Sequence, residues 1–113
     1  MPLVTVEDAA PVDPAAIDDA LQRVAGAVAE ALGRPAAEVW ARFVATDGTL
    51  FAGGGRHPIV TVASGEQPAD VVERVLRAAA DALASALGVA PDAVWARFDV
   101  LARGTVLSAG AVQ

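Results

Sequence analysis

The chain has 113 residues, the size of one ordinary domain, and 55% of them are hydrophobic, so it can form a core and is not expected to be disordered. No apolar run approaches the roughly 18–20 residues of a membrane span, and no basic segment followed by an apolar block opens the chain. We therefore expect a cytoplasmic protein without a secretory signal or membrane contact. The absence of cysteine excludes disulfides, thiolate nucleophiles and zinc–thiolate sites.

The charge balance is acidic, with 8 basic against 14 acidic residues and a formal net charge of −6. A nucleic-acid-binding domain needs clustered cations to neutralise phosphates, so this composition argues against a nucleic-acid partner. Because His57 is the single histidine, a transition-metal site would have to consist mostly of carboxylates, and we expect no metal.

The chain contains an internal repeat. The segment ALGRPAAEVWARF at 31–43 reappears as ALGVAPDAVWARF at 86–98, with eight of thirteen positions identical. Two further pairs of blocks match in the same order, PLVTVE with PIVTVA and GTLFAGG with GTVLSAG. Since a solenoid needs at least three repeats, we expect a single domain over 1–113 that consists of two copies of one unit, at about 2–54 and 58–110.

The first unit predicts a strand, a long helix, a second strand and a short third strand. PLVTVE is short and β-branched, as a strand requires. Asp13 and Pro14 suit the N-cap and first turn of a helix, and Gly33 suits its C-terminal stop. Apolar residues recur between them at helical spacing, at Ile17, Leu21, Val24, Val28 and Leu32. Strands over 39–45 and 49–52 follow.

The second unit predicts the same order of elements. PIVTVA is the strand, Pro68 opens the helix and Gly88 ends it, with strands over 94–101 and 105–108 beyond. The apolar stripe of this helix comprises Val71 or Val72, Val75 or Leu76, Ala79, Leu83 and Leu87. A right-handed crossover makes the strands that flank each helix parallel. The duplicated unit therefore predicts an α+β fold of two layers, with a four-stranded main sheet and two helices on one face.

The two VWARF segments predict the character of the sheet face that the helices leave open. Alternation along a strand places Trp40 and Arg42 on that face, and it places Trp95 and Arg97 there in the second unit. Tryptophan and arginine are enriched in interfaces. We expect this face to be buried in an oligomer or to line a site; the alternative is a solvated face with incidental tryptophans.

Pro2 carries the strongest chemical signal. Initiator methionine is normally removed before a small side chain, which would leave a secondary amine at the start of a buried strand. Burial and nearby arginine charge lower the pKa of such an amine from the ordinary range of roughly 7.7–8.0, so that it is neutral near pH 7. A neutral amine can act as a general base or attack a carbonyl. Proline also suits a strand start, so Pro2 alone does not establish catalysis.

The MPLVTVE start, the β-α-β unit, its duplication and the length together resemble the tautomerase superfamily over essentially the whole chain. The duplicated single-chain form is similar to the macrophage migration inhibitory factor group, and one copy resembles the smaller 4-oxalocrotonate tautomerases. LFAGGGRHP at 50–58 resembles the glycine-rich join of that group. The resemblance implies a homotrimer with a sheet-lined centre, no cofactor, and an N-terminal proline that moves a proton in keto–enol isomerisation.

The resemblance also implies a set of site residues. Pro2 matches the catalytic proline, and Arg34 stands where the group has a substrate-binding lysine. Trp95 and Arg97 stand where the group has a tyrosine and an asparagine from the adjacent subunit. Either arginine could clamp a substrate carboxylate. The alternatives are an interface ion pair for Arg97 and a cation at a helix C-terminus for Arg34.

Three other features limit these expectations. Dehalogenase, decarboxylase and oxalocrotonate types place arginines after the first strand of a unit, whereas EDAAPVDP and ASGEQPAD contain none. That argues against those activities and against dicarboxylate binding in the usual manner. The nitrogen of Pro58 is an amide and cannot be a base. We expect structural or interface roles for Trp40 and Arg42, and a solvated loop position for His57.

The sequence therefore predicts a cofactor-free keto–enol tautomerase, an isomerase, that acts on a small α-keto acid or enol bearing a carboxylate. Pro2 would be the general base, and Arg34, Trp95 and Arg97 would bind the substrate. Two alternatives from other classes stay open. One is a non-catalytic trimeric scaffold or small-molecule-binding protein of the same fold, and the other is a ferredoxin-like regulatory domain, which the strand–helix order also allows.

Overall fold

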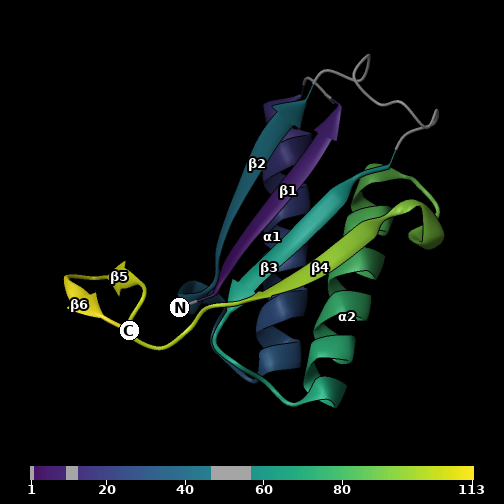
Figure 1. The fold of residues 1–113 in the computed structure, drawn as a ribbon. Coiled ribbons are helices and arrows are strands. Elements are labelled where there is room, and N and C mark those ends of the chain that lie inside the picture. The colour runs from purple at the N-terminus through teal and green to yellow at the C-terminus, as the bar shows by residue number, and fades with distance from the viewer. Residues whose placement is uncertain (1, 10–12, 47–56) are drawn as a thin grey trace.

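Two β-α-β units make up the body of the molecule (Figure 1). The structure is a computed structural model, and it describes residues 2–9, 13–46 and 57–113. The first unit comprises β1 (Leu3–Ala9), α1 (Pro14–Leu32) and β2 (Trp40–Thr46). The second comprises β3 (Ile59–Ser64), α2 (Ala69–Leu87) and β4 (Trp95–Val100). Single 3-10 turns, Ala36–Glu38 and Pro91–Ala93, precede β2 and β4.

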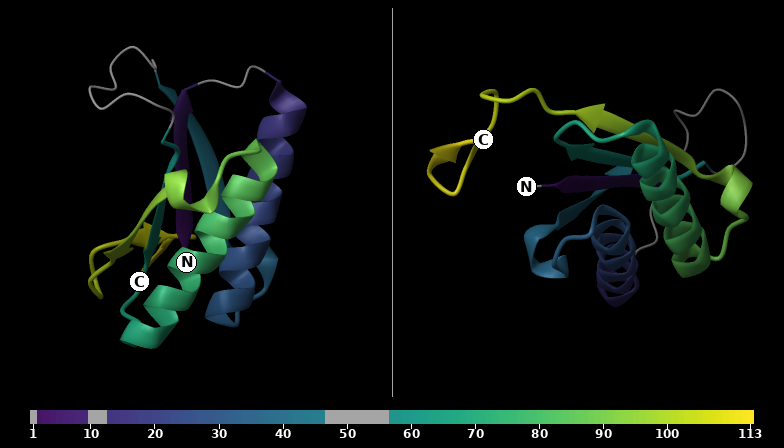
Figure 2. Two further views of the ribbon diagram at one scale, coloured as in Figure 1. Left: turned by 90° about the vertical axis from the view of Figure 1, so that its right-hand side faces the viewer. Right: turned by 90° about the horizontal axis from the view of Figure 1, so that it is seen from below.

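The four long strands form one mixed sheet in the order β2-β1-β3-β4. Each helix joins two adjacent parallel strands, and the two units meet where β1 pairs with β3 in antiparallel fashion. Both helices lie on the same face of the sheet (Figure 2). The predicted two-layer α+β fold is confirmed. The adjacency of β1 and β2 excludes the split β-α-β arrangement of a ferredoxin-like domain, in which another strand separates the two.

Both helices begin and end where the sequence predicts. The Asp13 carboxylate accepts a hydrogen bond from the Ala15 N–H at 3.0 Å, which caps α1. Gly33 follows α1 with φ 68° and ψ 35°, a left-handed conformation in which its N–H donates to carbonyls of the last turn. Gly88 occupies the same position after α2. Among the described residues, no helix has both the length and the apolar character needed to cross a membrane.

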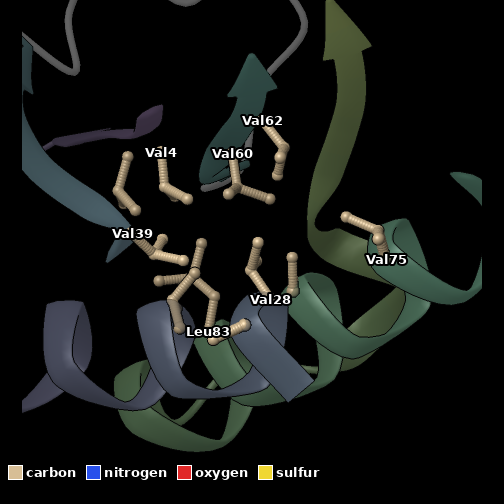
Figure 3. Close-up of a cluster of buried hydrophobic side chains, with 11 residues drawn as sticks. Val4, Val28, Val39, Val60, Val62, Val75 and Leu83 are labelled. Atoms are coloured by element: carbon tan, nitrogen blue, oxygen red, sulfur yellow. The ribbon is translucent and has the colours of Figure 1, made fainter. Parts of the chain in front are cut away.

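Valine dominates the core between the sheet and the helices. Side chains from β1 and β3 point toward those of α1 and α2 (Figure 3). The fully buried apolar residues are Val4, Val6, Val24, Val28, Val60, Val62, Val75, Ala79 and Leu83. Each large one contributes about 1.5–3 kcal/mol by burial. Buried alanines such as Ala20 and Ala84 allow the two helices to pack closely against the sheet and each other.

The helix-free face of the sheet carries the residues that alternation predicts. Ala41, Phe43, Ala96 and Phe98 pack against the core, whereas Trp40 and Trp95 on the opposite face are 55% and 57% exposed. The strand register arranges this open face in three rows across β2, β1, β3 and β4. The rows are Trp40–Leu3–Ala63–Asp99, Arg42–Thr5–Thr61–Arg97 and Val44–Glu7–Ile59–Trp95.

The structure differs from the prediction at the short third strand of the second unit. The strand expected over 49–52 lies outside the described residues. The one expected over 105–108 is reduced to β5 (Leu107–Ser108), which pairs with β6 (Ala111–Val112) and not with the main sheet. Ala109 and Gly110 both have positive φ, at 52° and 76°, which is the geometry of a tight hairpin turn. This turn directs the chain end into a hairpin that stands away from the helices (Figure 1).

Two glycines of the first unit give a matched test of the helix geometry. Replacing Gly33 with Ala should lower the free energy of unfolding by about 1–2 kcal/mol, because an L-residue is strained in the left-handed region. Replacing Gly26 with Ala, in the middle of α1, should raise it by about 0.5–1 kcal/mol, since a Cβ there meets nothing within 4 Å. Urea unfolding at one protein concentration measures both. Equal effects of the two substitutions would contradict this description of the helix end.

Candidate functional site

Pro2 lies at the start of β1, enclosed by its neighbours. Its side chain is fully buried, and its carbonyl accepts a hydrogen bond from the Trp40 N–H at 3.0 Å. The pairing of Leu3 with Ala63 places Pro2 beside Ser64, whose side chain is also buried. The predicted base therefore sits between the start of β2 and the end of β3, in surroundings that exclude water from its ring.

A cavity of about 670 Å³ opens at the same end of the sheet. Ser64, the neighbour of Pro2, is part of its wall, whereas the side chain of Pro2 is not. The remaining wall comes from the ends of α1, β3 and β4 and from the chain that follows β4, including Arg34, Glu66, Leu101, Arg103 and Val106. The Leu101 N–H donates to the Ser64 carbonyl at 2.7 Å and holds the segment after β4 against β3. The cavity is of the size that small-molecule sites have.

Arg34 reaches this cavity from the end of α1. Its N–H donates to the Ala29 carbonyl at 2.9 Å, which fixes its backbone directly after the helix. Its guanidinium lies 3.3 Å from the Glu38 carboxylate, and both side chains are 46% exposed. An ion pair this exposed contributes little to stability and is broken at small cost. Arg34 is thus placed at the cavity with a partner that a substrate carboxylate could replace.

Trp95 and Arg97 do not join Pro2 within one chain. The Trp95 N–H donates to the Pro58 carbonyl at 2.9 Å, so Trp95 stands beside the internal counterpart of Pro2. It shares a row with Ile59, at the end of the sheet opposite to Pro2. Arg97 lies in the middle row and forms an ion pair with Asp99. The four predicted site residues therefore form no single cluster in this chain.

The end of the sheet at Pro58 repeats the geometry at Pro2 with different chemistry. Trp40 and Trp95 make the same backbone hydrogen bond, one to each proline carbonyl. Asp8 and Ser64 occupy matching positions in the two units, and both are buried. The end at Pro58 therefore has a buried carboxyl group where the end at Pro2 has a buried hydroxyl group. His57 is exposed, with Nδ1 3.2 Å from the Ala93 carbonyl, in agreement with the expected loop position. Arg42 donates from Nε to the Thr5 hydroxyl at 3.0 Å.

The sequence analysis missed Arg103 as a residue of the cavity wall. It follows β4 in a stretch without periodicity, so no helix or strand pattern marks it. The repeat nonetheless contains a signal. Arg103 in the second unit aligns with Asp47 in the first, because the matched segments read RGT and DGT. A change from an acid to a base between two copies of one unit can identify a position where the copies have different roles. Within the described residues, no group of three or more His, Cys, Asp or Glu side chains could hold a metal ion.

Known proteins resemble this chain in structure and not in sequence. No protein-family model and no curated protein matches the sequence. Among solved structures, a fused 4-OT described as a symmetric trimer has a TM-score of 0.86 and 21% identity, covering 97% of this chain and 94% of its own. Macrophage migration inhibitory factor of Toxoplasma gondii has a TM-score of 0.84 and 19% identity, over 98% and 99%. A protein inactivated by 2-oxo-3-pentynoate has a TM-score of 0.87 and 18% identity, over 97% and 94%.

The fold is that of the tautomerase superfamily. The resemblance found in the sequence is thereby confirmed for the architecture. Identities this low identify the tautomerase fold alone, and one fold hosts several reactions. The reaction must therefore be argued from the residues at the Pro2 end of the sheet.

The two tryptophans give a direct measure of whether the open face is covered in solution. They are the only tryptophans, the chain has no tyrosine, and both lie on that face, so tryptophan fluorescence reports this face alone. We expect blue-shifted emission with little acrylamide quenching at micromolar concentration, and a red shift on dilution as the molecules separate. Trp40→Phe and Trp95→Phe variants assign the signal to each edge. Water-exposed emission at every concentration would show that the face is solvated.

Proposed function

We propose that the protein is a cofactor-free keto–enol tautomerase that acts on a small α-keto acid or its enol. The observation that carries the proposal is the buried Pro2 next to a cavity bordered by arginines. Removal of Met1 makes the Pro2 nitrogen a secondary amine. Burial of the Pro2 ring would disfavour the protonated form of that amine.

The proposed reaction needs only one proton carrier. The neutral Pro2 nitrogen takes the proton of the enol oxygen, which gives an enolate and a protonated amine. The protonated amine then returns the proton to the carbon that lies next to the carbonyl, on the side away from the carboxylate, which gives the ketone and restores the base. No electrons are exchanged, so this route uses no cofactor. Arg34 stabilises the substrate carboxylate and the enolate charge by charge-assisted hydrogen bonds, which become strong once the bound substrate displaces water from the cavity.

We further propose that the site is completed by a second chain in a homotrimer. A fused 4-OT of the same fold is described as a symmetric trimer. In this chain the residues that the resemblance assigns to the adjacent subunit, Trp95 and Arg97, lie far from Pro2 and on the open face. A cyclic trimer uses a heterologous interface, so each Pro2 would face Trp95 and Arg97 of one neighbour.

The competing function is a trimeric scaffold or binding protein without catalysis. One observation favours it: the side chain of Pro2 is enclosed and does not itself line the cavity. If Met1 remained attached, the same cavity would bind a carboxylate without any base. Intact mass separates the two functions, because the enzyme requires the loss of one methionine.

Replacing Pro2 with Ala should lower kcat/KM for the enol of phenylpyruvate by about a hundredfold or more, which is the usual contribution of a positioned general base. The trimer should persist, as measured by light scattering. 2-Oxo-3-pentynoate, which inactivates a protein of the same fold, should add once per chain at the Pro2 nitrogen, located by peptide mass spectrometry.

Pro58→Ala is the matched control for this experiment. Pro58 is buried and accepts a tryptophan N–H as Pro2 does, but its nitrogen is an amide. The control should keep normal activity and react normally with 2-oxo-3-pentynoate. Full activity of the Pro2→Ala variant would end the tautomerase proposal.

Subunit complementation tests the shared site. Pro2→Ala and Arg97→Gln chains should each be strongly impaired alone, because each removes one half of every site. Unfolding and refolding them together should restore about a quarter of normal activity, since in a cyclic trimer one site in four then pairs an intact Pro2 with an intact Arg97. As a control, Pro2→Ala mixed with the double variant should recover nothing. Mixed trimers without recovered activity would show that Arg97 serves no neighbouring Pro2.

A further inference from the structure

The three rows of the helix-free sheet face contain two cations and two acids. Arg42 and Arg97 lie in the middle row, Asp99 lies on the edge strand β4, and Glu7 lies on the inner strand β1. These rows therefore have no net charge, in a chain whose formal net charge is −6. A face with balanced charge and two exposed tryptophans suits a second copy of this chain better than a strongly charged partner.

Only one of the two arginines on this face is paired with an acid. Arg97 forms an ion pair with Asp99, two residues further along the same strand. The matching position after Arg42 is Val44, because the two units read WARFD and WARFV. Arg42 donates from Nε to the Thr5 hydroxyl, and among the described residues no carboxylate engages its two terminal nitrogens. Arg42 is thus a cation without an acid on a face that carries one acid too many for Arg97 alone.

Glu7 is the remaining acid of this face. It is half-buried and lies between Val44 on β2 and Ile59 on β3. Its counterpart in the second unit is Ala63, so the repeat itself does not require an acid there. In the part of the chain that the structure describes, no ion pair engages its carboxylate, although Arg42 lies one row away on the neighbouring strand. A carboxylate between apolar side chains is stable under a covering partner only when a cation meets it.

We propose that Arg42 of one molecule forms an ion pair with Glu7 of the next when these faces associate. The inference rests on the homotrimer proposed above and names the residues that direct its assembly. In a closed ring each contact joins two different patches, so one such contact, repeated, gives every Arg42 an acid and every Glu7 a cation. The Nε of Arg42 can keep its bond to Thr5, because the two terminal nitrogens remain for the carboxylate. A misaligned contact would bury each charge alone, so the pair selects one register of the two faces.

Reversal of the two charges tests the pair. Arg42→Glu and Glu7→Arg should each raise the concentration at which the assembly dissociates by about tenfold to a hundredfold, because each places like charges opposite one another. Arg42→Gln and Glu7→Gln should act in the same direction by a smaller factor, and the variant with both reversals should assemble as the wild type does. Light scattering measures the assembly, and circular dichroism checks that each variant is folded. Glu73→Arg and Arg77→Glu, which reverse an exposed pair on α2, are the controls and should change nothing.

A mixture of the two single variants distinguishes a contact between molecules from one within a molecule. Arg42→Glu and Glu7→Arg chains together should assemble at a lower concentration than either alone, since the introduced acid of one chain then meets the introduced cation of the other. Native mass spectrometry should find both chains in one assembly. If the pair formed within one chain, each variant would keep its like charges and the mixture would gain nothing, which would overturn the inference. Rescue of Arg42→Glu by Asp99→Arg chains and not by Glu7→Arg chains would overturn it as well.

The assembly measurements are independent of turnover, so the separate proposals can fail separately. If the wild-type protein assembles but neither reversal weakens the assembly, the ion pair is wrong and the homotrimer stands. A wild-type protein that is monomeric at every concentration would overturn the homotrimer and the ion pair together. If the charge reversals and the mixture behave as expected but no enol is isomerised, the tautomerase proposal fails and the ion pair stands.

Discussion

The antiparallel pairing of β1 with β3 is the constraint on which the rest of the structure depends. With Thr5 opposite Thr61, the start of one strand lies at the end of the other, so Pro2 and Pro58 stand at opposite ends of one sheet. Each end then receives the tryptophan of its own unit and the last described residues of the other unit's first strand. The two ends share the hydrogen bond from a tryptophan N–H to a proline carbonyl, and they differ in the side chains around it and in the chemistry proposed for the proline nitrogen.

Electrostatics distinguishes the end at Pro2. Arg34 and Arg103 reach the cavity there from two elements that are far apart in sequence. Their positions are set by main-chain hydrogen bonds, after a helix in one case and in a turn in the other. Cations placed before the ligand arrives need little reorganisation when charge develops on an enolate. In an acidic chain, this arrangement concentrates positive charge where an anionic substrate would enter.

Most of the fold could be predicted because the repeat presents each pattern twice. The β-branched runs, the helix caps at Asp13 and Gly33, and the alternation in VWARF are local signals, and tertiary packing agrees with all of them. The hairpin could not be predicted, since its turn uses Ala109 at positive φ, which alanine rarely adopts. The cavity could not be predicted either, because loops without periodicity form most of its wall. Arg34, which lies in the cavity wall, was singled out from its position after the helix, whereas Arg103 has no pattern around it.

The buried pair Asp8 and Ser64 shows what duplication permits. The two residues occupy matching places, yet the carboxyl lies toward Pro58, where the neighbouring nitrogen is an amide and cannot take up a proton. A carboxylate beside an amine would favour the charged amine and so leave less of it in the neutral form that can take up a proton near pH 7. A hydroxyl carries no such penalty. Once two copies are joined in one polypeptide, each copy can change independently. An acid that would keep the Pro2 amine protonated can therefore remain beside Pro58.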